Sequence, residues 1–367
     1  MTPLSAAQLQ HKVSHGEIIE GLVINQALLE GVTLRGAIFN QVDFVGVTLA
    51  DQCLDEVLFD QCRLENIDFS RATLSGCRFN HCQLPHADFT GGELKNNVFN
   101  HCRLDGGRFH HTTLTETQFL QCSLDAATVE QAVVEKVVWF HSTLHHARLT
   151  ECRVSLATLV DIDLQRTLFT GNSFDRSQFV GCIHSNNQYL SQIFTACQFT
   201  DSLLDQVNFS HAVLNGSCFK GASLRNACLD DVQSAQALFI ESNLQQASCR
   251  RSCFDQSQFI GADLQYADFS HSNLQHALFH HAQATGCLLA DCDLTYADFS
   301  GADLSAADLR RAHFHRTRMH RATLTGAQLT HGPGILARDE ALYAAEEWSR
   351  RRQPAVPTVD VQQRDPL

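Results

Sequence analysis

The feature that most constrains this 367-residue chain is a five-residue period in its large apolar residues. Of its 24 phenylalanines, 23 stand at positions whose number ends in 4 or 9, and leucine recurs at every tenth residue from Leu54 to Leu124. The frame runs from Ile19 to Leu329, which makes 63 consecutive pentapeptides without an insertion or deletion. We call the large residue the centre of each unit. Such a repeat predicts a solenoid, in which each unit packs on its neighbours.

A second position, two residues before the centre, is usually small. Examples are Ala72, Cys77, Cys82, Ala87 and Gly92, and the other three positions are mostly polar. A period of five fits neither a helix nor a strand. Residues two apart in an extended chain point to the same side, so we expect the small and large residues to face inward together. Because the remaining residues must turn a corner, each unit is predicted to be a short strand followed by a turn.

Longer periods indicate how many units make one coil. Phenylalanine and leucine alternate with a ten-residue period, and the stretch "FNHC" at 79–82 returns at 99–102. Four units per coil reconciles both observations and predicts four walls, with phenylalanine on two opposite walls and leucine on the other two. One column of stacked centres should contain Phe59, Phe79, Phe99, Phe119 and Trp139.

The units resemble a known family. The stretches "GADLQYADFS" (261–270) and "SGADLSAADL" (300–309) are similar to the A(D/N)LXX repeat of the pentapeptide-repeat proteins. The resemblance covers residues 19–329 and implies an all-β solenoid, the right-handed quadrilateral parallel β-helix. The 63 units would form about sixteen coils, and thus a rod of roughly 75 Å at a strand spacing of about 4.8 Å.

The ends of the solenoid need caps, because terminal coils expose backbone edges and core. We expect an N-terminal cap over 1–18, where Ser5 and Gln8 have the spacing of a capping box. The repeat then spans 19–330, a C-terminal helix follows over 331–352, and 353–367 form a disordered tail. The helix serves either as a lid on the last coil or as a homodimer interface, and its candidate interface residues are Leu336, Leu342, Tyr343 and Trp348.

A few centres break the pattern. His184, Ser234, Cys249 and Ala284 stand where phenylalanine or leucine is expected. Around His184 the small positions are also unusual, with Asn187 and Gln192. Polar groups that face inward are costly unless they are hydrogen-bonded. We expect a bent or loosened coil with satisfied polar groups, and the alternative is a ligand or partner site.

The paired His-Cys stretches resemble half of a zinc site, because histidine and cysteine are the usual zinc ligands. In the repeat, however, Cys82 and Cys102 fill the small inward position, while His81 and His101 are corner residues that face solvent. They are predicted not to share one ion, and only the outer histidine row is left as a candidate for weak metal binding. The cysteines are expected to act as small hydrophobic residues. We predict no resident metal or cofactor.

Other catalytic arrangements are missing from the sequence. The carboxylates that recur before the centres follow the repeat, so their spacing does not indicate an acid–base pair. The sequence contains no phosphate-binding glycine loop, no nucleophile elbow and no HExxH motif. The chain is therefore not expected to be an enzyme.

The charge distribution is uneven. Through residue 309 there are 34 Asp and Glu against 17 Lys and Arg. Residues 310–321 then add five arginines without an acid, and we predict a basic docking end made by Arg310, Arg311, Arg316, Arg318 and Arg321. Apolar residues also recur at an outward position on one wall, where we expect them to form part of a partner interface: Leu58, Val98, Val138, Leu238 and Leu278.

The function expected from these features is that of a non-enzymatic protein-binding scaffold or adaptor. The chain lacks a signal-peptide pattern and a long apolar run, so a bacterial cytoplasmic protein without membrane contact is expected. The degenerate units look like those of accessory proteins of contractile (type VI) secretion systems. The alternative is a DNA mimic that binds DNA gyrase or topoisomerase to inhibit or protect it. A third hypothesis is that the solenoid has only a structural role and that the C-terminal helix and tail carry the function. Direct nucleic-acid binding is not expected, because a phosphate-binding surface should be basic.

Overall fold

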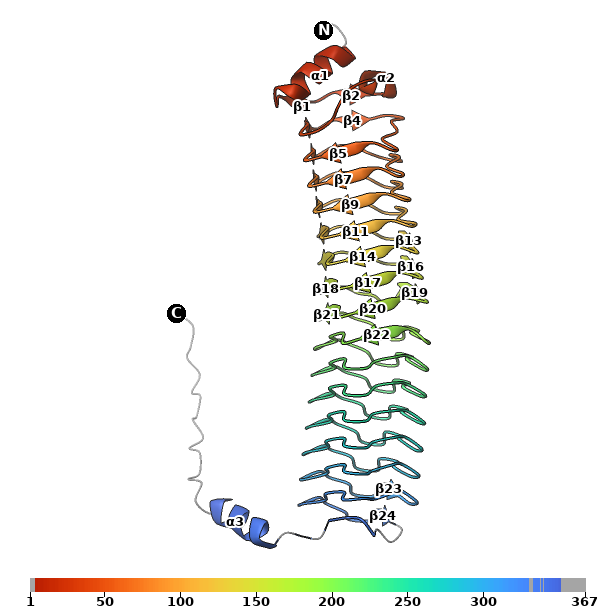
Figure 1. Cartoon of the computed structure of the whole chain (residues 1–367), viewed down its shortest axis with the longest axis vertical. Coiled ribbons are helices and arrows are strands. Elements are labelled where there is room, and N and C mark those ends of the chain that lie inside the picture. The colour runs from red at the N-terminus through yellow and green to blue at the C-terminus, as the bar shows by residue number, and fades with distance from the viewer. Residues whose placement is uncertain (1–3, 330–332, 337, 339, 351–367) are drawn as a thin grey trace, which may run out of the picture.

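The computed structural model describes residues 4–329, 333–336, 338 and 340–350, and shows a straight rod of stacked coils (Figure 1). Every strand pair is parallel and offset by twenty residues, as in Phe39↔Phe59 and Phe59↔Phe79. Twenty residues therefore make one coil, and the repeat forms about sixteen coils. The predicted parallel β-solenoid with four units per coil is confirmed.

The four walls of the rod are named here as faces A to D, in the order in which the chain visits them. Face A holds nine paired strands: β1 (Ile18–Glu20), β3 (Ile38–Asn40), β6 (Leu58–Asp60), β8 (Arg78–Asn80), β10 (Val98–Asn100), β12 (Gln118–Leu120), β15 (Val138–Phe140), β18 (Thr158–Val160) and β21 (Gln178–Val180). Single parallel bridges continue this face to Arg318.

Face B begins with β2 (Val23–Ile24) and β4 (Asp43–Phe44) and continues through bridges. Face C holds β13 (Thr128–Glu130), β16 (Arg148–Thr150) and β19 (Leu168–Thr170), and later β23 (Asp308–Leu309) and β24 (Gln328–Leu329). Face D holds eight strands: β5 (Cys53–Asp55), β7 (Thr73–Ser75), β9 (Glu93–Lys95), β11 (Thr113–Thr115), β14 (Val133–Glu135), β17 (Arg153–Ser155), β20 (Ser173–Asp175) and β22 (Ile193–Thr195).

Each corner of the coil is made by a residue in the left-handed conformation, two positions after the centre. At these positions 45 non-glycine residues and 15 glycines have φ between 46° and 72°. Apart from glycine, Asn, Asp and His adopt this region most readily. The left-handed conformation therefore explains why the position two residues after the centre is rich in glycine, Asn, Asp and His. It also accounts for the histidines at this position, His81 (φ 52°) and His101 (φ 51°).

The corners are of two kinds, which differ in the backbone bond of the small residue. In a compact corner the small residue's backbone N–H donates to the preceding centre, as from Ala72 to the Phe69 carbonyl at 3.0 Å. In an open corner, such as that at Cys82, this backbone bond is absent. The side chain of the small residue can donate in corners of both kinds. The Cys82 thiol donates to the carbonyls of Phe59 and Asn80, both at 3.3 Å. Nine of the ten cysteines at the small position donate to a carbonyl 23 residues earlier in the chain: Cys62, Cys77, Cys82, Cys102, Cys122, Cys152, Cys182, Cys197 and Cys292. They are hydrogen-bond donors, and not only the small hydrophobic residues that the sequence indicated.

The core consists of stacked columns of centres. On face A the ring centroids of Phe59 and Phe79 are 4.8 Å apart, those of Phe79 and Phe99 are 4.6 Å apart, and Phe119 stacks on Trp139 at 5.8 Å. This is the predicted aromatic column. Stacked rings of this kind add to the free energy gained from burial of their area.

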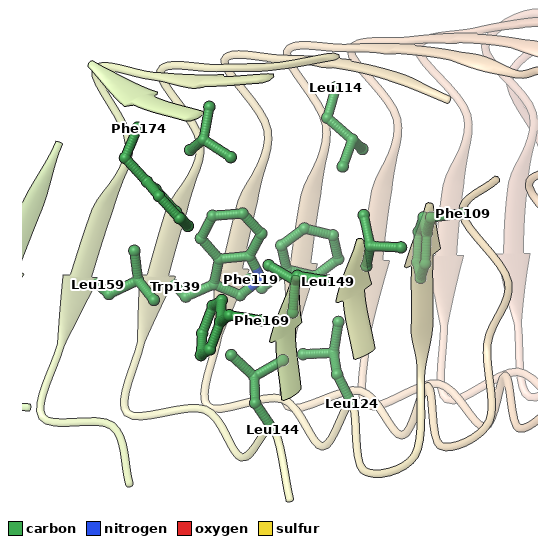
Figure 2. Close-up of a pocket in the computed structure, with 12 residues that line it drawn as sticks. Phe109, Leu114, Phe119, Leu124, Trp139, Leu144, Leu149, Leu159, Phe169 and Phe174 are labelled. Carbon is green, nitrogen blue, oxygen red and sulfur yellow. The ribbon is translucent and has the colours of Figure 1, made fainter. Parts of the chain in front are cut away.

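The core is thinnest between residues 119 and 169, where no centre is a phenylalanine. Valine or leucine replaces it there, as at Val129 and Val154, and an apolar internal cavity of about 20 Å³ results. Figure 2 shows the indole of Trp139 within this space, between Phe119 and Phe169. Its buried Nε1 has no hydrogen-bond partner, and because the lining is apolar a water molecule would find no second partner there.

The two ends of the rod differ. At the N-terminal end α1 (Ala6–Ser14) begins with the predicted capping box of Ser5 and Gln8, and Leu9 and Val13 are buried against the first coil. A four-residue helix, α2 (Gln26–Leu29), is built into that coil. At the other end α3 (Glu340–Arg350) lies beside the last coils (Figure 1). Within the described residues this helix begins at Glu340, nine residues after the predicted start at 331. Residues 351–352 of the predicted helix and the predicted tail, 353–367, lie outside the described residues.

Filling the internal cavity should stabilise the rod. Val154→Leu adds one methylene towards the cavity, so the free energy of unfolding should rise by about 1 kcal/mol. Val134→Leu is the matched control, since Val134 stands in the same column but does not line the cavity. Urea unfolding followed by circular dichroism measures both. Equal effects of the two substitutions would show that the cavity does not limit stability.

The donor role of the inward cysteines can be tested at Cys82. Serine keeps a donor, and Ser142, three coils further along the same column, already makes the equivalent bond to the Phe119 carbonyl at 3.1 Å. Alanine removes the donor, and the loss of this hydrogen bond costs about 1 kcal/mol. Cys82→Ser should therefore lower the urea midpoint less than Cys82→Ala does. The opposite order would mean that volume alone matters at this position.

Candidate interaction surface

The carboxylates before the centres are structural. The Asp268 side chain accepts from the Ser270 backbone N–H at 2.9 Å, and the same bond recurs along the rod at Asp263, Asp293, Asp298, Asp303 and Asp308. Hydrogen bonds from the side chain and backbone of Ser305 hold the pKa of Asp303 below its ordinary value. Asn243 and Asn273 replace aspartate with the same geometry. These bonds close the turn after the centre, so they account for the D/N of the repeat without any acid–base chemistry.

The outer histidine row is a stack of rings. The imidazoles of His81 and His101 lie 4.9 Å apart and are nearly parallel, at 6°. Within the part of the chain that the structure describes, no three His, Cys, Asp or Glu side chains gather in a way that could hold a metal ion. Among the same residues all cysteines are free thiols.

The irregular coil encloses a polar cluster. His184 is fully buried, and its Nδ1 lies 2.6 Å from the hydroxyl of Tyr189. Asn187 donates to the Tyr189 hydroxyl and to the Leu164 carbonyl, at 3.1 and 2.7 Å, and Gln192 donates to the Phe169 carbonyl at 3.0 Å. The expected satisfied polar groups are thus present, with one exception: the buried His184 Nε2 has no partner. Tyr189 was not singled out in the sequence because it occupies a centre as an ordinary aromatic residue.

The predicted basic end is largely neutralised by ion pairs. Arg310 pairs with Asp308, Arg311 with Asp291 and Arg318 with Asp298, at 2.6, 2.6 and 3.5 Å. Arg321 is engaged by α3. Among the described residues only Arg316 of the five makes no ion pair. Four of the five arginines are thus not unpaired charges, because each coil brings an acid from twenty residues earlier, or from the same turn, alongside the arginine, and Arg321 pairs with α3. Their role as a docking end stays a prediction.

Helix α3 is attached to the rod through polar contacts. The Tyr343 hydroxyl accepts from the Arg321 backbone N–H at 2.9 Å, and the Glu346 carboxylate accepts from His320 Nε2 at 3.0 Å and from the Arg321 guanidinium. These donors hold the pKa of Glu346 below its ordinary value. Leu342 and Trp348 are 45% and 57% exposed. The helix is therefore not the apolar lid that the sequence allowed, and a cleft of about 420 Å³ separates it from the coils around His280, Gly301 and Arg321.

The predicted apolar column lies on face A. Leu58, Val98, Val138, Leu238 and Leu278 all precede a face A centre, and each is partly exposed. The structure adds a second apolar column on the same face, after the centres, which the sequence reasoning missed: Leu120, Phe140, Val160, Val180, Ile240 and Ile260. The signal was present, since these residues also lie at multiples of twenty from one another.

The buried histidine predicts a pH dependence of stability. Burial lowers the pKa of His184 to about 3, whereas an unfolded histidine titrates near about 6.5. The unfolded state therefore binds the extra proton between these values, so this contribution to stability is complete above about pH 6.5 and is lost at up to about 1.4 kcal/mol per pH unit as the pH falls.

His184→Leu places the residue found at Leu164 and Leu204 in the same column. The substitution should remove the part of the change in unfolding free energy with pH that is due to His184. His81→Gln at an exposed corner is the control and should leave the slope unchanged. Urea midpoints at pH 7 and pH 5 give the measurement. If the His184→Leu variant showed the same change in urea midpoint between pH 7 and pH 5 as the wild type, His184 would not be a source of the pH dependence.

The comparisons with known proteins agree with this architecture. The family described as "Pentapeptide repeat region" matches residues 32–109, and "Pentapeptide repeats (8 copies)" matches 193–231, 242–280, 272–311 and 297–331. No curated protein matches the chain. No helix in the described part of the chain has the length and apolar character needed to cross a membrane.

Solved structures with a similar fold are distant. QnrB1, a plasmid-mediated fluoroquinolone resistance protein, is 20% identical with a TM-score of 0.27, over 47% of this chain and 94% of its own. HetL from Nostoc sp. strain PCC 7120, a pentapeptide repeat protein involved in heterocyst differentiation regulation, is 20% identical with a TM-score of 0.20, over 71% and 89%. The A-module of the Azotobacter vinelandii mannuronan C-5 epimerase AlgE4 is 10% identical with a TM-score of 0.20, over 91% and 96%. The family matches span more than half of the sequence, and the chain belongs to the pentapeptide-repeat proteins.

Proposed function

We propose that the chain is a non-enzymatic scaffold that binds a protein partner. The observation that carries this proposal is the use of its polar groups: the outward aspartates close turns, and arginines such as Arg251 and Arg311 pair with acids of the preceding coil. In the described residues no three His, Cys, Asp or Glu side chains gather in a way that could hold a metal ion. The rod instead offers a rigid shaft, because every coil is hydrogen-bonded to the next in register.

The C-terminal end is the proposed docking site. Leu324 and Leu329 of the last coil are exposed, as are Leu336, Leu342 and Trp348 beyond it. Arg316 and the cleft beside α3 supply polar neighbours. Such a mixture of aromatic, aliphatic and arginine side chains is typical of protein interfaces. A homodimer through α3 is one form that this contact would take. The narrower expectation of an accessory protein of a type VI secretion system rests on the resemblance of the units and stays a prediction.

A DNA mimic that acts on gyrase is the second candidate, and the acidic shaft supports it, with 34 acids against 17 bases through residue 309. The pairing of acids with arginines one coil away speaks against it, as in Asp51–Arg71 and Asp231–Arg251. A mimic of the duplex needs rows of free negative charge, as DNA itself has. Gyrase supercoiling that falls with added protein would favour this candidate over the scaffold.

Deletion of residues 335–367 separates docking at the end from docking along the shaft. Immobilised full-length chain should retain specific protein partners in quantitative affinity purification, and the deletion should lose them. Trp348→Asp should lose them as well, whereas Leu203→Asp, a matched change on the shaft at a 47% exposed leucine, should retain them. Partners that bind the deletion variant equally would move the site to the shaft. Recovery of no partner above a bead control would contradict the scaffold.

A further inference from the structure

Face A differs from the other three walls in charge. From Val98 to His280 it presents twenty outward side chains over ten coils. None is Asp or Glu, and Lys220 is the only Lys or Arg. Ten of the twenty are Val, Leu, Ile or Phe. Each of the other faces carries three to five acids over ten coils. A rod with a strongly negative shaft therefore has one long neutral wall.

The apolar side chains of this wall are aligned by the sheet. Leu120 pairs with Phe140, Phe140 with Val160, and Val160 with Val180, each in register between neighbouring strands. Phe140 and Val180 are 39% and 38% exposed. The ten coils span about 43 Å at a spacing of about 4.8 Å. The aligned apolar side chains lie on the coils from Val98 to Val180 and again from Leu238 to Leu278, with polar side chains between the two groups. Exposed apolar surface that gathers on one face usually marks an interaction site.

We propose that face A is a self-association surface, on which a second copy of this chain packs face to face through the wall between Val98 and His280. Two sheets pack well when their side chains interdigitate over a common spacing. The side chains of face A recur at the spacing between coils, about 4.8 Å. Face A of a second copy has the same spacing over its full length, so the two sets of side chains can stay in step, whereas a surface without this repeat would fall out of step. Charge favours the same arrangement, because two acidic rods repel each other along the remaining faces but not along this one.

The corners on either side of face A set the orientation of the two copies. In the corner row before the centres, Lys136 pairs with Glu116 at 2.9 Å and Arg176 pairs with Asp175 at 2.8 Å. The row after the centres carries Asp161, Asp201 and Glu241 and no Lys or Arg from 101 to 281. A two-fold axis parallel to the rod brings the charge-balanced row of one copy against the acidic row of the other. An axis across the rod would bring the two acidic rows together, where they repel. The copies are therefore parallel.

The contact area predicts a weak complex. A strip about 43 Å long and about 10 Å wide gives about 430 Å² of flat contact per copy, which is less than the roughly 800 Å² that each partner buries in a stable interface. Dimers should form only at high protein concentration. This contact is independent of the proposed docking end, since it uses no residue beyond His280.

Sedimentation equilibrium of the full chain tests the proposal, with expected monomer–dimer behaviour. Phe140→Glu and Val180→Glu should each weaken the dimer at least tenfold, because every copy would then bury a charge at the contact. Leu168→Glu on face C and Leu203→Glu on face B are matched controls at 54% and 47% exposed leucines, and should leave the dimer unchanged. All four positions are outward, so circular dichroism should show a retained fold.

Two further measurements keep the alternatives apart. A variant without residues 335–367 should dimerise like the full chain, and loss of the dimer would assign it to α3 instead. Zero-length carbodiimide cross-linking of mixed ¹⁴N and ¹⁵N protein should give an inter-copy link between Lys136 and Asp161, and its absence would overturn the parallel arrangement. A wild type that stays monomeric at every concentration, or a dimer indifferent to Phe140→Glu and Val180→Glu, would overturn the proposal.

Discussion

The in-register hydrogen bonding of each coil to the next is the interaction on which the whole structure rests. Because the offset is always twenty residues, side chains of one type are brought into columns, and each column behaves as a unit. The phenylalanine stack on face A, the corner row of His81 and His101, and the ion pairs of Asp291 with Arg311 are all consequences of the same offset. A single exposed ion pair contributes little to stability. Repeated stacking of buried aromatic rings contributes much more.

The left-handed corner is the cost of this regularity. A non-glycine residue in this conformation is strained, at about 1 kcal/mol or more, and the rod contains dozens of such residues. The left-handed corners make the coil narrow enough for four centres to fill its interior. The packing of these centres offsets the strain of the corners. Where the fillers are smaller, around Val129 and Val154, a cavity opens and the Trp139 N–H is left unsatisfied. Interior volume and corner geometry are therefore coupled.

The sequence predicted the fold almost completely. Its five-residue period identified the inward residues, and the recurrences at ten and twenty residues gave the number of units in each coil. It placed Cys82 inside and His81 outside, as the structure has them, and the aromatic column up to Trp139. It did not predict the thiol hydrogen bonds, since the residue at the small position was judged by its size and not by its ability to donate. The pairing of Arg311 with Asp291 was within reach, because opposite charges twenty residues apart are neighbours in such a coil.

The candidate site was harder to predict. The contact of Arg321 with Glu346 joins a coil to a helix outside the repeat, so no period reports it. The neutral wall was predicted only in part, because the apolar residues before the centres form one outward column, whereas face A has a second column after the centres. The Tyr189 hydroxyl beside His184 was missed for a similar reason, since a centre is judged by its size and not by its polar end.

Duplication of repeat units tests the central claim that the twenty-residue register organises the rod. Duplicating one whole coil, residues 240–259, keeps every column continuous, so the urea midpoint should be unchanged and the rod should lengthen by about 4.8 Å in small-angle X-ray scattering. Duplicating the single unit 255–259 preserves the five-residue pattern but moves all later centres to the next wall, so the columns break and the midpoint should fall. If the five-residue duplication is tolerated as well as the twenty-residue one, the columns are not what holds the rod together.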